Sequence, residues 1–162
     1  MNLDLLRNIE LNTYPLFSLN GYITYAKLLS NYDGDTADIF FIYNEMPMHV
    51  KARFYGYDCS EIKPSLNDPN RDEKKKKALL AKKYLWTLCT NETDNKTHKT
   101  LIKIKCGNYD KYGRLLITAF KEDIDIDFDG KDDKTLFELS INNQMIKDGH
   151  GYAYYGGTKE DF

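Results

Sequence analysis

The distribution of apolar and polar residues over the first sixty positions predicts three β-strands, two from stretches rich in apolar and β-branched residues and the third from period-two alternation. The first covers residues 21–32, the second is the apolar run 39–43, and the third covers residues 48–57. Asp-Gly at residues 33–34 and a proline-containing segment at 44–47 mark the turns between them. The first half of the fold is therefore expected to contain three consecutive strands.

The third predicted strand divides its side chains between two faces, because successive residues of a strand point to opposite sides. One face is expected to carry Val50, Ala52, Phe54 and Gly56. The other is expected to carry Lys51, Arg53, Tyr55 and Tyr57. Arg53 is therefore expected on a rigid element, and Asp58 and Glu61 follow in a loop that can aim them at a ligand.

Helical spacing replaces alternation later in the chain. Residues 71–89 are expected to form the longest helix, with apolar residues at intervals of three and four: Leu80, Ala81, Tyr84, Leu85 and Leu88. A second helix is expected at residues 135–147, where Gly149 is suited to end it. Residues 3–11 can form a short helix that Pro15 limits.

Two further strands are predicted at residues 99–106 and 115–120. Three strands before the long helix and two after it are typical of a small OB-type barrel. The predicted fold is mainly β (α+β), a five-stranded OB-fold β-barrel with two or three α-helices packed on it. An α+β sandwich also fits this pattern. We expect one such domain at residues 21–162, preceded by an N-terminal extension at residues 1–20.

Composition is typical of a globular protein, since 41% of the residues are hydrophobic and 14% are aromatic. Because the net charge is only −2, any affinity for nucleic acid has to come from a local basic patch. The three cysteines share no CxxC spacing, which favours free thiols in a reducing compartment. The sequence shows no signal-peptide core and no run of about 18 apolar residues. We therefore expect a cytoplasmic or otherwise intracellular protein without a membrane segment.

The most concentrated charges lie around the second and third strands. Asp33 and Asp35 flank the glycine of a turn, and Arg53, Asp58 and Glu61 lie in or just after the third strand. Each is ordinary alone, because Asp-Gly turns are common in hairpins and a strand arginine usually faces solvent. Holding these charged side chains close together costs free energy unless a ligand binds among them. The three histidines are dispersed and pair with no cysteine, which argues against a zinc site.

Together these motifs resemble the staphylococcal nuclease (thermonuclease) family. The resemblance covers about residues 21–155 and rests on Asp-Gly-Asp-Thr at 33–36, the spacing of Arg53, Asp58 and Glu61, Asp-Lys-Tyr-Gly-Arg at 110–114, and the segment 149–155. It implies an OB-fold hydrolase, a Ca²⁺-dependent phosphodiesterase that cuts DNA and RNA and leaves 3′-phosphate ends. We expect the protein to act on these nucleic acids as a monomer.

The resemblance also implies which residues hold the metal ion. Asp35 and Asp58 match the carboxylate ligands of Ca²⁺, and the backbone carbonyl of Cys59 matches a further ligand. Asp33 matches a residue beside metal-bound water. The usual Thr-Pro after the second aspartate is replaced by Cys59-Ser60. Only the carbonyl is needed at the first position, but loss of the proline is expected to loosen the following loop and to lower the rate.

Further roles follow from the same resemblance. Glu61 matches the carboxylate that orients or deprotonates the attacking water, and the sequence does not distinguish these two roles. Arg53 and Arg114 match the guanidinium groups that grip the phosphate, while Tyr112 and Tyr155 match tyrosines that line the nucleotide pocket. The chemistry agrees, because phosphodiester hydrolysis accumulates negative charge on oxygen. Planar guanidinium groups and a hard cation can stabilise that charge.

Several segments allow two interpretations. The acidic segment 122–133 reads partly as an EF-hand loop, but Leu136 stands where a bidentate glutamate is required, which favours a solvated hairpin tip. The lysines at 74–77 with Lys82 and Lys83 can follow a nucleic-acid backbone or form a solvated helix face. Trp86, Cys89 and Cys106 are expected in the core. The extension 1–20 is expected to cover the surface that a C-terminal helix covers in the family.

Two alternative functions remain open at this level. Domains of this family also serve as catalytically silent readers of nucleic acid or protein, but these usually lack part of the charged group that this chain retains. A bare OB-type single-strand binder, in which aromatic stacking dominates and metal is irrelevant, is the other alternative.

Overall fold

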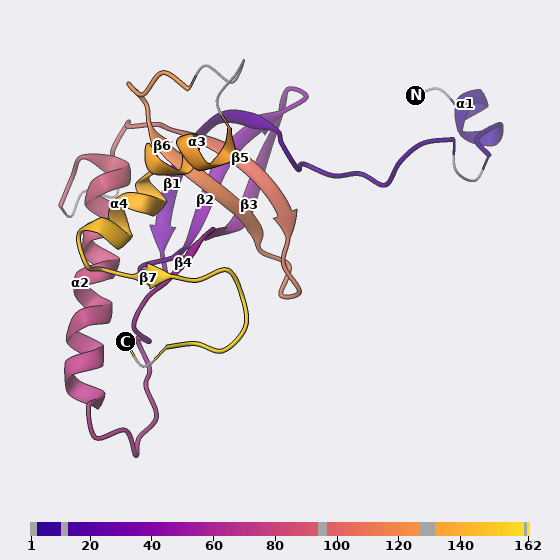
Figure 1. Ribbon diagram of the computed structural model, residues 1–162. Coiled ribbons are helices and arrows are strands. Elements are labelled where there is room, and N and C mark those ends of the chain that lie inside the picture. The colour runs from indigo at the N-terminus through magenta and orange to yellow at the C-terminus, as the bar shows by residue number, and fades with distance from the viewer. Residues whose placement is uncertain (1–2, 11–12, 94–96, 127–131, 161) are drawn as a thin grey trace.

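Five strands close into a barrel in the computed structural model, which describes residues 3–10, 13–93, 97–126, 132–160 and 162. The barrel strands, in spatial order, are β1 (Ile23–Asn31), β2 (Thr36–Tyr43), β3 (Met46–Phe54), β6 (Leu115–Lys121) and β5 (Ile102–Tyr109). Figure 1 shows this barrel with the helices that follow residue 70 gathered on one side and end, while the N-terminal helix lies apart. The predicted five-stranded OB-like α+β barrel is confirmed, and closure of the sheet excludes the open sandwich.

Four helices and a small second sheet complete the described structure. The helices are α1 (Leu3–Arg7), α2 (Arg71–Thr90), α3 (Asp133–Glu138) and α4 (Ile141–Lys147). The second sheet pairs β4 (Tyr57–Asp58) with β7 (Tyr152–Ala153) in antiparallel register. No helix in the described ranges is long and apolar enough to cross a membrane.

The barrel closes through a parallel pairing between β3 and β6. Its register places Arg53 opposite Leu116 and Phe54 opposite Ile117. All other barrel pairs are antiparallel. This closure brings the end of β3 beside the start of β6, so Arg53 and Arg114 come from adjacent strands although 61 positions separate them in the sequence.

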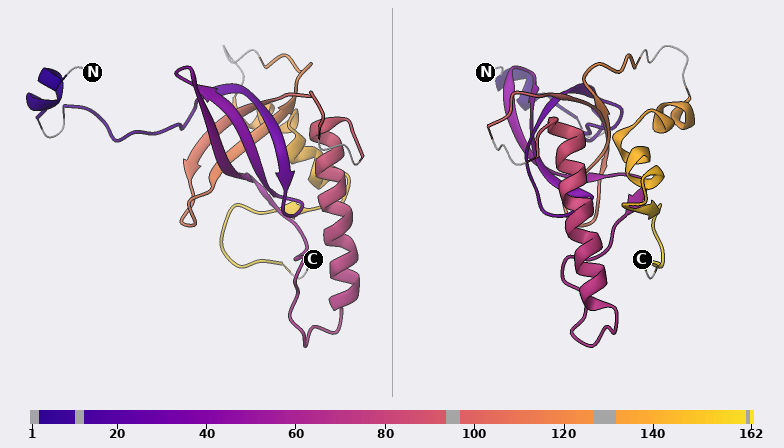
Figure 2. Two further views of the ribbon diagram at one scale, coloured as in Figure 1. Left: turned by 180° about the vertical axis from the view of Figure 1, so that it is seen from behind. Right: turned by 90° about the vertical axis from the view of Figure 1, so that its left-hand side faces the viewer.

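Helix α2 packs on the barrel through a narrower face than the sequence predicts. Ala81, Leu85 and Cys89 are buried, as expected for a stripe at helical spacing. Leu80 is 58% exposed, so its assignment to the buried face is wrong. Its neighbour Ala81 is 1% exposed, so α2 turns Ala81 toward the barrel and Leu80 away from it. Figure 2 shows the N-terminal half of α2 extending beyond the end of the barrel. Trp86 is buried as expected.

The third predicted strand is shorter than expected. β3 ends at Phe54, and the chain turns at Gly56, whose φ of +89° favours glycine. Tyr57 then begins the separate strand β4 and is fully buried rather than on the exposed face. Its hydroxyl donates a hydrogen bond to the carbonyl of Gly34, 2.7 Å away, which links the end of β3 to the turn before β2.

The second predicted helix is in fact two helices. Ser140 interrupts it, because its side chain accepts a hydrogen bond from the backbone N–H of Asn143 and thereby caps α4. Gly149 follows the end of α4 with a φ of +74°, as predicted. The interruption turns α4 onto β6 and places its residues next to the barrel wall.

The described part of the N-terminal extension makes little contact with the barrel. Helix α1 buries none of its residues, and Figure 1 shows it well apart from the other elements. Leu19 is buried, and Phe17 packs edge-on against Tyr43 with ring centres 5.7 Å apart. The expectation that this extension covers the surface that a C-terminal helix covers in the family is not met by α1, because none of its residues is buried.

The structure tests only part of the interpretations of the acidic segment 122–133 and of the lysines in α2. Asp127, Asp129 and Gly130 of the EF-hand-like segment lie outside the described residues. The lysines of α2 lie at the surface, where Lys77 pairs with Glu73 at 3.8 Å and lies over the ring of Phe162. The cysteines at 59, 89 and 106 are free and buried, as expected.

Candidate functional site

All the predicted site residues line one cleft of about 700 Å³ at the end of the barrel. They are Asp33, Asp35, Arg53, Asp58, Cys59, Glu61, Tyr112, Arg114 and Tyr155. Four separate parts of the chain supply them: the turn before β2, the β3–β4 region, the β5–β6 hairpin and the segment after β7. The barrel closure and the β4–β7 pairing bring these parts together.

Arg53 lies at the centre of the charged residues and is only 8% exposed. Its Nη2 lies 3.0 Å from Asp58 Oδ1 and 3.3 Å from Asp35 Oδ2. The guanidinium also donates to the carbonyls of Phe54, at 2.6 Å, and Tyr57, at 2.8 Å. These contacts hold both carboxylates within reach of one positive group.

Asp35 is a buried carboxylate whose ionised form is disfavoured in the folded protein. Its Oδ1 accepts a hydrogen bond from Thr36 Oγ1 at 3.1 Å, and its Oδ2 accepts one from the N–H of Cys59 at 3.2 Å. Burial raises the pKa of Asp35 to about 8, and the charges of Asp33 and Asp58 add to this, against the opposing effect of Arg53. The attraction of Arg53 therefore does not offset the loss of hydration that burial imposes on this carboxylate.

Asp33 shapes the turn that presents Asp35. Its Oδ1 accepts hydrogen bonds from the backbone N–H groups of Asp35, at 3.0 Å, and Thr36, at 2.8 Å. This is the local bonding that makes aspartate common in turns. A Cβ at Gly34 would lie 2.7 Å from Ala81 Cβ and from Cys59 Sγ, so the turn can approach α2 only with glycine there.

Asp58 is bonded on both of its oxygens. Oδ1 pairs with Arg53, whereas Oδ2 lies 3.1 Å from Lys159 Nζ and accepts a hydrogen bond from the hydroxyl of Tyr152 at 3.0 Å. Burial and the charge of Asp58 raise the pKa of Tyr152 to about 12, so this hydroxyl remains a donor. Burial alone would lower the pKa of Lys159, but its bond to Asp58 raises it.

Tyr152 and Lys159 are the residues that sequence reasoning missed. Tyr152 falls in the aromatic segment 149–155 and is paired with Asp58 by the β4–β7 register. That segment was recognisable, but nothing in it singled out Tyr152. Lys159 lies in a short polar stretch that carries no motif, so only the folded structure identifies it.

The loop after β4 places Glu61 at the exposed edge of the cleft. Next to it, Cys59 is buried, and burial raises the pKa of its thiol well above the ordinary value. The thiol is therefore a small packing group rather than a nucleophile. Ser60 donates a hydrogen bond from its hydroxyl to the carbonyl of Phe162 at 2.7 Å. This bond fixes the loop in which Cys59-Ser60 replaces the Thr-Pro that the resemblance implies.

Arg114 reaches the cleft from the start of β6. Its Nε pairs with Asp110 Oδ2 at 2.7 Å, and its Nη1 donates to Thr36 Oγ1 at 3.3 Å. Burial would raise the pKa of Asp110, but hydrogen bonds from Arg114 and Tyr112 lower it below its usual value. Thr36 thus connects Arg114 to Asp35, since the same hydroxyl also donates to that carboxylate.

Exposed tyrosine rings border the charged centre. Tyr112 is 71% exposed and stacks under Arg114, whose guanidinium carbon lies 5.3 Å from the ring centre. Tyr155 is 65% exposed and meets Tyr55 edge-on at 5.7 Å. Rings with this exposure can stack on a nucleobase.

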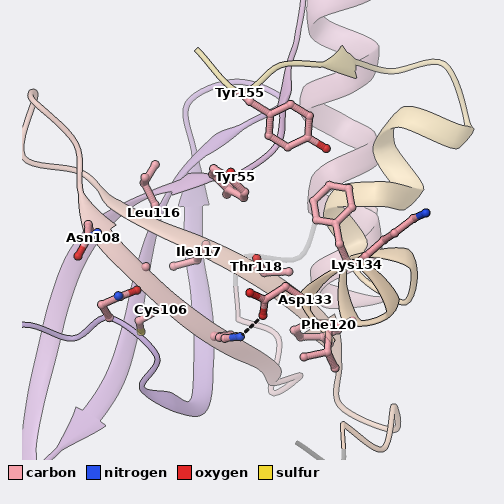
Figure 3. A pocket seen from close by; sticks show the side chains of 15 residues that line it. Tyr55, Cys106, Asn108, Leu116, Ile117, Thr118, Phe120, Asp133, Lys134 and Tyr155 are labelled. Carbon is pink, nitrogen blue, oxygen red and sulfur yellow. Dashed lines mark hydrogen bonds and ion pairs between the residues drawn. The ribbon is translucent and has the colours of Figure 1, made fainter. Parts of the chain in front are cut away.

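A second groove adjoins the cleft and shares Tyr55 and Tyr155 with it. Its volume is about 540 Å³, and Figure 3 shows it between the outer face of β5 and β6 and helix α3. The ion pair between Lys105 and Asp133, at 2.6 Å, neutralises the lysine on its floor. The groove is therefore mainly apolar and carries little net positive charge.

The donor set at the centre of the cleft fits a hard cation such as Ca²⁺. Asp35 and Asp58 are buried and contact the same guanidinium nitrogen, so both present carboxylate oxygens at one place in the cleft. Among the residues that the structure describes, no three His, Cys, Asp or Glu side chains converge closely enough to hold a metal ion. Carbonyl, water and substrate oxygens would have to supply the remaining ligands.

Comparison with known proteins does not assign the chain to a family. No family model matches the sequence, and no curated protein matches it significantly. The proposed function therefore rests on the geometry of the cleft and on the motifs that line it.

Proposed function

We propose that the protein is a Ca²⁺-dependent phosphodiesterase that hydrolyses DNA and RNA and belongs with the staphylococcal nuclease family. One observation carries this proposal. Two buried carboxylates, Asp35 and Asp58, share a cleft with two guanidinium groups, Arg53 and Arg114, and with the exposed carboxylate of Glu61. Buried charge of both signs in one cleft is typical of a site that binds a charged ligand.

Asp35 and Asp58, with the backbone carbonyl of Cys59, are the residues that would hold Ca²⁺. When bound, such an ion supplies positive charge to a phosphoryl oxygen. Arg114 lies at the cleft wall with its Nε fixed by Asp110, which leaves part of its planar fork directed toward a phosphate. Arg53 neutralises the carboxylates in the described structure and can bind phosphate once another cation compensates them.

Glu61 is the group that would orient or deprotonate the attacking water. It is exposed at the cleft edge, where water and a phosphate can both reach it. A bond forms between the water oxygen and phosphorus while the bond from phosphorus to O5′ breaks. The proton of the water passes to Glu61 or to solvent, and the leaving O5′ takes up a proton from solvent water to become a 5′-hydroxyl. The other product carries the 3′-phosphate.

Tyr112 and Tyr155 would bind the nucleotide on either side of the reacting phosphate. Both rings are largely exposed, and Tyr112 is supported by Arg114. Stacking contributes about 1–3 kcal/mol per base and does not depend strongly on base identity. Such contacts are consistent with activity on both DNA and RNA.

A catalytically silent binding module is the second candidate, and one observation favours it. Arg53 and Lys159 already compensate Asp58 without a metal ion. A cleft that is neutralised from within can bind nucleic acid through its tyrosines and Arg114 alone. The two candidates differ in whether cleavage occurs.

The first experiment is digestion of single-stranded DNA, duplex DNA and RNA with Ca²⁺, with Mg²⁺ and with a chelator. Cleavage that requires Ca²⁺, is lost in Glu61→Gln and persists in the matched variant Glu138→Gln supports the enzyme. Glu138 is exposed on α3 and does not line the cleft. Absence of cleavage in every condition, with oligonucleotide binding retained, would establish the binding module instead.

A further inference from the structure

The segment that follows β7 folds back over the candidate metal site. Figure 1 shows it leaving β7 in a wide loop and returning toward the chain that follows β4. We call residues 152–160 the strap. Tyr152 begins the strap in β7, and Lys159 near its end reaches the same carboxylate as Tyr152 does.

Several contacts fix the strap on both sides of Lys159. The backbone N–H of Glu160 donates to the hydroxyl of Tyr152 at 3.1 Å, and that hydroxyl donates to Asp58. Phe162 lies beyond, with its ring 5.2 Å from that of Tyr152 and its carbonyl bonded to Ser60. The ammonium group of Lys159 is therefore held at Asp58 by the fold of the strap.

A divalent cation and Lys159 compete for the same oxygen. Asp58 Oδ1 is paired with Arg53, whereas Oδ2 is bonded to both Lys159 and the hydroxyl of Tyr152. A cation that binds at Oδ2 therefore has to displace a donor. Arg53 has a side chain only 10% exposed and is fixed by two backbone carbonyls, whereas the side chain of Lys159 is 52% exposed. Lysine also has a flexible stem and a single charged point. Lys159 is thus the donor that can leave at least cost.

From this geometry we infer that Lys159 is a built-in counter-cation of Asp58, which stabilises the metal-free site and which a divalent cation displaces. The inference rests on the proposed function, since it assumes that Asp58 is a metal ligand. It adds that the strap sets the affinity of the site for metal. Two effects of opposite sign follow: removing the charge of Lys159 destabilises the metal-free protein and strengthens cation binding.

The test compares Ca²⁺ binding by titration calorimetry in the wild type, Lys159→Gln and the control Lys111→Gln. Lys111 is exposed in the same cleft and lies over Tyr112 rather than on a carboxylate. We expect Lys159→Gln to lower the Kd for Ca²⁺ about five- to tenfold, as for removal of one partly exposed competing charge. Its unfolding midpoint in chelator should fall, while Lys111→Gln changes both quantities little.

The remaining outcomes separate the two hypotheses. Equal or weaker Ca²⁺ binding by Lys159→Gln, with clear binding by the wild type, overturns the inference and leaves the nuclease proposal intact. An equal gain in affinity in Lys111→Gln overturns it too, because the effect would then come from the general charge of the cleft. Absence of Ca²⁺ binding in all three proteins overturns both the inference and the proposed metal site.

Discussion

Arg53 and Arg114 have the same charge but different surroundings, and each has a distinct expected role. Arg53 is buried between two carboxylates and two carbonyls. Arg114 is held by Asp110 on one side and borders the open cleft on the other. We therefore expect Arg53 to be needed for folding as well as for the site, and Arg114 to be needed mainly for binding phosphate.

Arg114→Ala is expected to lower the cleavage rate about 10²-fold or more, the usual loss when one preorganised donor to an oxyanion is removed. Because the side chain is half-buried and at the surface, the unfolding midpoint should change little. Single-turnover cleavage and thermal unfolding measure the two quantities. Arg7→Ala is the matched control, since Arg7 lies on the exposed helix α1. A rate within twofold of the wild type would exclude a role in phosphate binding.

Arg53→Ala is expected to reduce both activity and stability. It leaves two buried carboxylates without their shared partner, a change that typically costs about 3–5 kcal/mol. Urea denaturation in chelator measures this loss. Added Ca²⁺ should restore part of it, because the cation replaces the lost positive charge. An unchanged urea midpoint would show that the contacts of Arg53 contribute nothing to stability.

At the scale of elements, one buried polar residue couples α4 to the barrel wall that carries the cleft. Asn142 is fully buried. Its amide donates to the carbonyls of Tyr55 and Ile117, both at 2.9 Å, and its carbonyl accepts from the N–H of Ala119 at 2.9 Å. These bonds satisfy the carbonyl of Tyr55 at the turn after β3 and the N–H of Ala119 in β6. They also add a second donor to the carbonyl of Ile117, which accepts from the N–H of Tyr55 as well.

Asn142→Ala is expected to destabilise the fold by about 3 kcal/mol, because two buried backbone groups lose their partner and the carbonyl of Ile117 loses one of its two donors. Asn143→Ala provides the control on the same helix. Its amide bonds only to the carbonyl of Glu138 at the surface, at 3.1 Å. Chemical denaturation of both variants gives the difference in free energy of unfolding. Equal values would show that water or a local shift satisfies the exposed groups.

For the whole molecule, the charge in the cleft links stability to pH. In the folded protein the pKa of Asp35 is about 8, so its carboxyl keeps its proton up to that pH. In the unfolded chain the carboxyl loses its proton near its ordinary pKa of 3.8. Between these values the folded state binds more protons, so stability contributed by this group is lost as the pH rises. Burial of an uncompensated charge is the physical cause.

Asp35→Asn removes this dependence. In chelator, the free energy of unfolding of the wild type should fall between about pH 4 and pH 8 relative to that of Asp35→Asn. Ca²⁺ should reduce the fall in the wild type, because a bound cation favours the ionised carboxylate. Thermal unfolding at several pH values measures both. Parallel curves for the two proteins would mean that Asp35 ionises normally in the folded state.

Local patterns in the sequence account for much of the fold. Stretches rich in apolar and β-branched residues predict β1 and β2, period-two alternation predicts the barrel part of β3, and helical spacing predicts α2. Each of these patterns follows from local backbone preferences. The turn at Gly34 and the end of α4 at Gly149 follow from residue type in the same way. Prediction failed where tertiary packing decided burial: Leu80 is exposed beside the buried Ala81, and Tyr57 turns inward after Gly56.

The sequence by itself determined which chemical groups are present. Its motifs also predicted that one site is formed by Asp35, Arg53, Asp58, Glu61 and Arg114. Only the tertiary structure decided how their charges are balanced. The parallel closure of β3 on β6 and the pairing of β4 with β7 join segments that no local pattern connects. The contacts of Tyr152 and Lys159 with Asp58 depend on these long-range pairings. Such contacts leave no periodic or motif signature, because they form only when distant parts of the chain have packed together.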